Sequence, residues 1–104
     1  MLIAPGINAD EQALADFCQR NGIRRLAVFG SALRDDFGPD SDVDFLVEFE
    51  PDRAPGMMAI VRMQGELEVL LGGRPIDLRT YGDLSRYFRD DVRATARPVF
   101  DAAA

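Results

Sequence analysis

The chain has 104 residues, a formal net charge of −6 and no histidine, and these facts exclude several classes of protein. The lack of histidine excludes Ser-His-Asp and Cys-His catalysis and disfavours a zinc site. The acidic balance disfavours direct nucleic-acid binding, because domains that bind the phosphate backbone of nucleic acids are usually basic. The single Cys18, expected in the core, excludes an internal disulfide and fits a reducing cytosol. No apolar run approaches the roughly 20 residues that span a bilayer. We therefore predict one cytoplasmic domain over residues 1–104 without a membrane partner.

The beginning of the chain predicts a loose lead-in over residues 1–7, then one helix and one strand. Asn8 and Glu11 have the spacing of a capping box, and apolar residues follow at helical spacing, so we predict a helix over residues 9–20. The apolar run Ile23–Phe29 has the length of a strand and ends at a Gly-Ser turn.

The rest of the chain continues to alternate between helices and strands. The clearest strand is Asp42–Phe49, where apolar and polar residues alternate so that one face is core and the other is half polar. The other predicted elements are a helical turn over 31–37, a helix over 56–71, a strand over 74–80, a helix over 83–94 and an edge strand over 96–102. This order predicts an α/β sandwich with a small sheet.

Three aspartates on the predicted strands are candidate metal ligands. Asp42 and Asp44 are two positions apart on one strand, so their side chains leave the same face with Cα atoms about 6.5–7 Å apart. Asp77 comes from another strand, between core-facing neighbours. If the two strands are adjacent in the sheet, the three carboxylates form one cluster. Such hard oxygen ligands suit Mg²⁺ or Mn²⁺, which also bind substrate phosphates.

A candidate phosphate-binding turn precedes these aspartates. Gly30 and Ser31 follow directly on a predicted strand, where glycine permits the close approach of phosphate oxygens and backbone N–H groups and the serine hydroxyl can donate to them. Arg34 is the nearest following cation and could bind triphosphate oxygens. The combination of an anion-binding turn and paired aspartates predicts a site for a nucleoside triphosphate with its metal ions.

Each feature also has a simpler interpretation. The Gly-Ser pair could be only a turn, and the paired aspartates only a solvated strand edge. Asp77 could pair with Arg74 or Arg79, and Arg34 with a neighbouring aspartate on the surface. The aspartates resemble the start of a calcium loop, but Phe45 stands where that loop needs glycine, so the calcium interpretation fails.

Taken together, these motifs resemble the signature of the polymerase-beta-like nucleotidyltransferase superfamily. The signature consists of Gly30-Ser31, ten intervening residues, Asp42-Val43-Asp44 and a later strand aspartate, Asp77. The surrounding segments "FGSALRDDFGPDSDVDFLVEFEP" and "LLGGRPIDLRT" are similar to the minimal nucleotidyltransferases, or MntA-like antitoxin proteins, and the resemblance covers residues 23–83. One departure is Gly38, which stands where a basic residue is often seen.

The resemblance implies a mixed sheet and a two-metal site for nucleotidyl transfer. Asp42 and Asp44 would bind both metal ions, and Asp77 would bind the catalytic one and help to deprotonate the acceptor. Gly30 and Ser31 would hold the triphosphate. The implied cofactors are Mg²⁺ or Mn²⁺ with ATP as the nucleotide donor. The implied partner is a HEPN-type toxin, whose tyrosine would receive AMP.

Two other functions remain open at this stage. The chain could be an antitoxin that acts by direct binding without catalysis, or a nucleotidyltransferase subunit that modifies a small molecule held by a separate acceptor-binding chain. Arg89, Arg93 and Arg97 are spaced four residues apart, and on one helix they could dock an acidic face of a partner.

Overall fold

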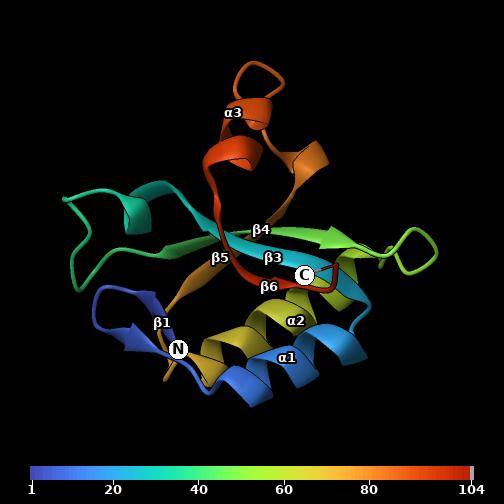
Figure 1. The fold of residues 1–104 in the computed structure, drawn as a ribbon, viewed down its shortest axis with the longest axis horizontal. Helices are drawn as coiled ribbons and strands as arrows, with labels where there is room; N and C mark the ends of the chain where they lie inside the picture. The colour runs from blue at the N-terminus through green and yellow to red at the C-terminus, as the bar shows by residue number, and fades with distance from the viewer. Residues whose placement is uncertain (104) are drawn as a thin grey trace.

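The computed structural model describes residues 1–103, which fold around a four-stranded sheet (Figure 1). The strands are β3 (Ile23–Phe29), β4 (Val43–Phe49), β5 (Ile76–Thr80) and β6 (Arg97–Asp101), in the spatial order β5-β4-β3-β6. β3 pairs antiparallel with both β4 and β6, whereas β4 and β5 run parallel. The predicted small mixed sheet in an α/β fold is therefore confirmed.

The helices cover the two faces of the sheet unequally. α1 (Glu11–Arg20) and α2 (Met57–Leu70) lie against one face, and the short α3 (Arg89–Thr95) stands over the other (Figure 1). The two longer helices lie within two residues of their predicted ends. The N-cap of α1 is Asp10 rather than Asn8, because the Asp10 carboxylate accepts a hydrogen bond from the Gln12 backbone N–H.

The expectation of a loose lead-in over residues 1–7 was wrong. β1 (Leu2–Ala4) and β2 (Ile7–Asn8) form an antiparallel hairpin that turns at Gly6, where φ is +76°. Ile3 is fully buried and joins the core. Burial of apolar side chains from both strands therefore orders a segment that local turn signals alone did not predict.

The helix predicted over residues 83–94 is interrupted. A 3₁₀ turn at Tyr81–Asp83 comes first, and α3 begins only at Arg89. The Thr80 backbone N–H donates to the Asp83 carboxylate at 3.1 Å, so Asp83 closes a capping box on the turn instead of starting a longer helix.

The main core lies between the sheet and the pair α1 and α2. Val43, Phe45 and Val47 are buried on this side, as the alternation predicted. The largest fully buried side chains are Phe17, Phe45, Ile3, Leu14, Leu26, Leu46 and Leu67. Leu46 is on the opposite face, between Asp44 and Glu48, so part of that face is covered as well. In the described part of the chain, no helix has both the length and the apolar character needed to cross a membrane.

Cys18 is expected to be inert towards thiol reagents in the folded protein. Its side chain is fully buried in the core, and burial raises the pKa of the thiol to about 12. Ellman's reagent should therefore react slowly with the native protein at mildly alkaline pH and quickly after denaturant is added. Rapid labelling of the native protein, measured by the absorbance of the released thiolate, would show that the core around α1 opens readily.

Candidate active site

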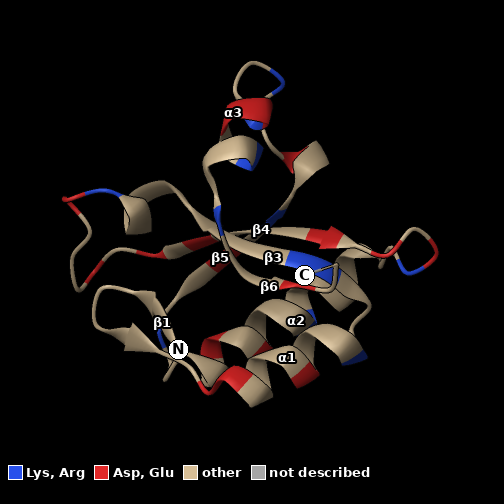
Figure 2. Cartoon of the chain, in the orientation of Figure 1, with Lys and Arg blue, Asp and Glu red and all other residues tan. Residues whose placement is uncertain are grey.

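The sheet register brings Asp44 and Asp77 side by side. Asp44 is the second residue of β4 and lies opposite Asp77 on the parallel strand β5. Paired residues on neighbouring strands point to the same face, about 4.8 Å apart along the hydrogen-bonding direction. Asp42 directly precedes β4 and is exposed. The predicted adjacency of the two strands is confirmed, and the acidic segments of β4 and β5 lie next to each other in Figure 2.

Gly30 packs directly against the Asp44 carboxylate. Phe29, the last residue of β3, pairs with Asp44, so the chain turns at Gly30 beside that side chain. The φ of Gly30 is +74°, and a Cβ atom built on it would lie 2.4 Å from Oδ2 of Asp44. Only glycine fits such a position, both for its left-handed backbone and for the close contact. The Gly-Ser turn and the acidic pair therefore form one site.

The surroundings of Asp44 raise the pKa of its carboxyl group. The largest cause is desolvation by partial burial, followed by the negative charges of Asp77 and Asp42. The Arg79 charge and a hydrogen bond from the Ser31 backbone oppose these effects without cancelling them. The site is therefore deficient in positive charge at the position where a cation would bind.

Ser31 connects the turn to the start of β4. Its hydroxyl donates to the backbone oxygen of Asp42, with 3.3 Å between the oxygen atoms. This bond fixes the spacing between the 3₁₀ turn Gly30–Leu33 and the strand that carries the aspartates. A role for Ser31 in holding a triphosphate stays a prediction, because the same hydroxyl would have to turn towards the phosphate.

Asp77 already has a cationic partner. Nε of Arg79 donates to Oδ2 of Asp77 at 2.9 Å, which is one of the two pairings considered from the sequence. Among residues 1–103, no group of three or more Asp, Glu or Cys side chains is arranged to hold a metal ion as it stands. The three carboxylates thus share a face without closing a ligand set. The pairing with Arg79 therefore competes with any cation that would bind at Oδ2 of Asp77.

The donor chemistry nevertheless fits a hard divalent cation. The available ligands are carboxylate oxygens. Desolvation, and then repulsion from Asp77 and Asp42, raises the pKa of Asp44, and a bound Mg²⁺ or Mn²⁺ would offset both effects. Assignment of Asp42, Asp44 and Asp77 as the metal ligands stays a prediction that this electrostatic imbalance supports.

Arg34 follows the turn but does not point its charge at the aspartates of the site. Its Nε lies 3.2 Å from Oδ1 of Asp36, and both side chains are largely exposed. An exposed pair of this type contributes about 0–1 kcal/mol, so it is easily exchanged for a better anion. Binding of triphosphate oxygens by Arg34 stays a prediction.

Arg74 is a supporting residue whose role the sequence did not reveal. Its guanidinium donates to the carbonyl of Ser41, at 3.0 Å from Nε and 2.7 Å from Nη2, and to the carbonyl of Gly38. It also stacks on Phe37, 4.8 Å from the ring centroid. Arg74 therefore holds the loop that leads into Asp42. Backbone carbonyl acceptors carry no residue signature, so no pattern in the sequence could have indicated these contacts.

Comparison with known proteins agrees with this geometry. Residues 11–98 match the family model described as the nucleotidyltransferase domain. The chain is 30% identical over 86 residues to a Methanocaldococcus jannaschii protein named as a protein adenylyltransferase, covering 83% of this chain and 89% of the relative. It is 43% identical over 60 residues to the protein adenylyltransferase MntA of Thermococcus cleftensis, covering 58% of each.

Solved structures also share the fold. A structure described as a minimal nucleotidyltransferase superposes with a TM-score of 0.68 at 35% identity, covering 85% of this chain and 87% of the other. A toxin–antitoxin structure with AMP-PNP has a TM-score of 0.69 at 17% identity, covering 88% and 73%, and this likeness concerns the fold alone. Because the family model spans most of the chain and the signature residues meet at one site, the chain belongs to the nucleotidyltransferase domain family and is a nucleotidyltransferase.

Proposed function

We propose that this chain is an Mg²⁺-dependent protein adenylyltransferase that acts as an antitoxin, with residues 1–104 as a single catalytic domain. It transfers AMP from ATP to a tyrosine hydroxyl of a HEPN-type toxin. The observation that carries the proposal is the contact of the Gly30 turn with Asp44, in register with Asp77. The names of the two relatives as protein adenylyltransferases support the choice of AMP and of a protein acceptor.

The reaction is a displacement at the α-phosphorus of ATP. The acceptor oxygen forms a bond to that phosphorus, the bond from it to the oxygen bridging to the β-phosphate breaks, and pyrophosphate leaves with the electron pair. Asp77 accepts the proton of the acceptor hydroxyl. Magnesium ions held by Asp42 and Asp44, with Asp77 as a further ligand, would neutralise charge on the phosphates.

The protein residues prepare this step by position and charge. Gly30 leaves the space that a side chain would fill, so a phosphate can approach the backbone N–H groups of the turn. Arg79, once Asp77 turns away from it, is free to pair with phosphate oxygens. Ser31 and Arg74 hold the turn and the loop that carry the reacting groups.

Intact-mass spectrometry tests the proposal directly. The toxin candidate encoded by the adjacent gene is incubated with this chain, Mg²⁺ and each nucleoside triphosphate in turn. We expect the candidate to gain the mass of one or more AMP groups with ATP, and peptide mapping should place them on tyrosine. Chelation of the metal with EDTA and the double substitution Asp42→Asn, Asp44→Asn should each abolish the gain.

Other results would select other functions. A stable complex that silences the toxin without any mass gain, equally with the double variant, would indicate an antitoxin that acts by binding. Neither a mass gain nor a complex would indicate an acceptor held by a different chain, such as a small molecule. A gain with another nucleotide would correct the donor and leave the protein acceptor in place.

A further inference from the structure

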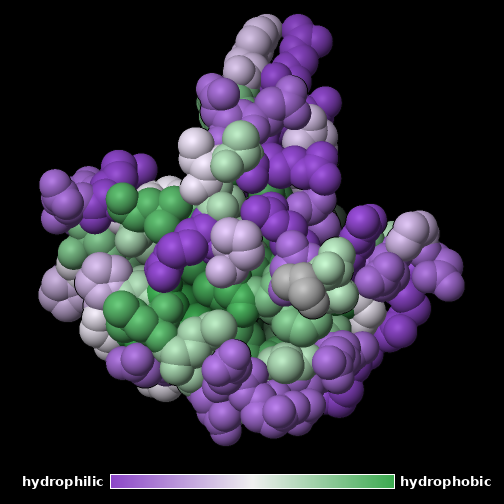
Figure 3. Space-filling view, viewed as in Figure 1, coloured by the Kyte–Doolittle hydropathy of each residue, from purple (hydrophilic) through white to green (hydrophobic). Residues whose placement is uncertain are grey.

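The segment between β5 and β6 forms an arm that stands away from the body. Residues 81–96, here called the arm, leave the end of β5 and return into β6 through α3. The arm rises from the sheet face opposite α1 and α2 (Figure 1), and the space-filling view shows it as a narrow projection (Figure 3). Such a projection offers most of its side chains to a partner.

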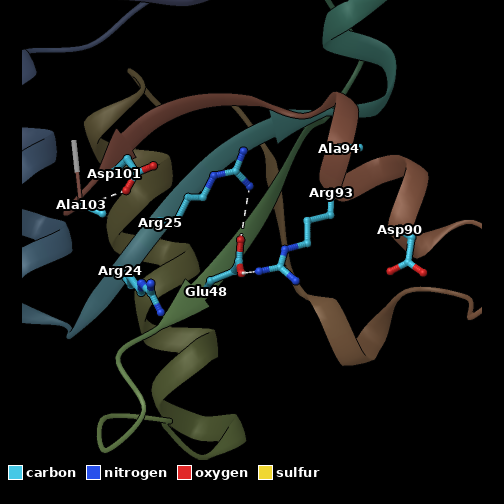
Figure 4. A pocket seen from close by; sticks show the side chains of 8 residues that line it. All are labelled: Arg24, Arg25, Glu48, Asp90, Arg93, Ala94, Asp101 and Ala103. Atoms are coloured by element: carbon cyan, nitrogen blue, oxygen red, sulfur yellow. Dashed lines mark hydrogen bonds and ion pairs between the residues drawn. The ribbon is translucent and has the colours of Figure 1, made fainter.

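The base of the arm is fixed to the sheet by ion pairs. Glu48 of β4 accepts from Arg93 of α3 at 2.8 Å and from Arg25 of β3 at 3.3 Å (Figure 4). The Tyr81 ring lies under two guanidinium groups, 4.7 Å from that of Arg89 and 5.5 Å from that of Arg93. These contacts hold the arm in one position before any partner binds, which lowers the ordering cost of association.

The tip of the arm exposes two aromatic side chains. Tyr87 is 80% exposed and Phe88 is 54% exposed, although large aromatic residues are normally buried for most of their surface. Arg86 stacks on Tyr87, with its guanidinium carbon 5.1 Å from the ring centroid. Tyrosine, phenylalanine and arginine are enriched at the centres of protein interfaces, where tyrosine and arginine supply much of the binding energy.

The arm carries less negative charge than the rest of the chain. Residues 81–96 contain three arginines and three aspartates, whereas the remainder contains nine arginines and fifteen acidic residues. Within the arm, residues 84–89 contain two arginines and no acidic residue, so a partner surface complementary to the tip is acidic.

The arginine stripe considered from the sequence does not form. Arg97 belongs to β6 and donates to the carbonyl of Ile3, and Arg93 is paired with Glu48. Arg86, which is exposed, and Arg89, which also stacks on Tyr81, are the basic residues that flank the exposed aromatics in the sequence. The basic surface is therefore concentrated at the tip of the arm instead of running along one helix.

The arm and the candidate active site share one face of the sheet. Glu48, which anchors the arm, is four positions beyond Asp44 on β4, so both side chains point to that face about 13 Å apart along the strand. Exposed apolar residues also occur on α2, at Met58 and Val61 among others, but α2 covers the opposite face. A partner on the arm would therefore lie on the same face of the sheet as the aspartates, whereas a partner on α2 would not.

From these observations we infer that the tip of the arm, centred on Tyr87 and Phe88, docks the toxin partner in an apolar pocket rimmed by acidic side chains. This inference rests on the proposed function, and it deepens that function by assigning the surface that brings the acceptor to the site. The exposed aromatics supply the apolar contact, and Arg86 and Arg89 pair with the acidic rim.

The test is calorimetric titration of the toxin candidate from the adjacent gene into the chain, with nucleotide transfer measured in parallel. The double variant Tyr87→Ser, Phe88→Ser should weaken binding by about 30-fold or more, the loss typical of one strong hot spot. Arg86→Glu should weaken it further as a separate variant, and wild-type binding should weaken with salt. The matched control Met58→Ser, Arg62→Glu on α2 changes equally exposed apolar and basic positions and should bind normally.

Each alternative result is distinguishable. All variants should keep the thermal unfolding midpoint and the affinity for AMP-PNP with Mg²⁺, which shows that the fold and the nucleotide site are intact. Normal binding by the arm variants, with loss in the α2 control, overturns the inference and leaves the proposed function standing. Absence of both a wild-type complex and nucleotide transfer overturns both, whereas transfer without a measurable wild-type complex overturns the inference alone. A wild-type dimer that the arm variants abolish, seen by light scattering, identifies a second copy as the occupant and also overturns the inference.

Discussion

Replacing Asp44 with asparagine is expected to lower the rate of nucleotide transfer by about a thousandfold or more without unfolding the protein. The loss follows because a carboxylate that holds a metal ion on the transferring phosphate accounts for several kcal/mol of transition-state stabilisation. The fold should survive because asparagine has the same shape and keeps an oxygen that can accept the Ser31 hydrogen bond. Transfer of labelled AMP to the acceptor protein measures the rate.

The same substitution should alter how stability depends on pH. Because the pKa of Asp44 is raised in the folded state, the folded protein binds this proton more tightly than the unfolded chain does. Its contribution therefore favours folding at low pH and is lost as pH rises from the ordinary aspartate pKa through the raised one. Above that window Asp44→Asn should be as stable as wild type or slightly more stable.

Urea denaturation at several pH values, with Asp35→Asn as an exposed control, separates the two effects. The control should keep full activity and the wild-type pH dependence, because Asp35 is exposed and does not contribute to the raised pKa of Asp44. A destabilised Asp44→Asn protein at neutral pH would contradict the assignment of Asp44 to a site that disfavours its charged form by desolvation and by the neighbouring carboxylates.

The second large effect is expected from Gly30→Ala. The new methyl group would lie 2.4 Å from Oδ2 of Asp44, and an L-residue at φ +74° is strained. The left-handed conformation costs about 1–2 kcal/mol, and relief of the collision costs about 1–3 kcal/mol more. Because the Asp44 carboxylate must move, transfer should also fall by about 100-fold. Urea denaturation and the transfer assay measure the two losses.

Gly72→Ala is the matched control for the backbone term. Gly72 has φ +75°, but a Cβ there meets nothing within 4 Å. This variant should lose about 1 kcal/mol of unfolding free energy and no activity. If Gly30→Ala behaved in the same way, the close packing of the turn on Asp44 would have no part in catalysis.

Local patterns were sufficient for most of the elements and for the choice of candidate site residues. The alternation in β4 and the helical spacing in α1 and α2 are properties of neighbouring residues, and they predicted these elements within two residues of their ends. The Gly-Ser turn and the paired aspartates were likewise readable, because glycine geometry and carboxylate chemistry are fixed by residue type. Cys18 was correctly placed in the core because it lies on the apolar face that the helical spacing of α1 defines.

Local patterns failed where distant residues decide the structure. The hairpin at residues 1–8 forms because Ile3 is buried by the core, and the split of the last helix depends on Asp83 capping a turn. Three-dimensional contacts also gave Arg74 its role, since it binds carbonyls more than thirty positions away.

By itself the sequence determined which groups are available: carboxylates for a hard cation, a glycine turn for phosphate, and no histidine. Only the tertiary structure decided that Asp77 stands beside Asp44, because strand order and register are set by packing across the whole sheet. It also decided that Arg79 pairs with Asp77, and that Arg97 lies on β6, apart from Arg89 and Arg93 of α3, so that no helical stripe of arginines forms. The ion pairs and the projection of the arm depend on which side chains, distant in the sequence, meet in space, and the tertiary structure determines those contacts.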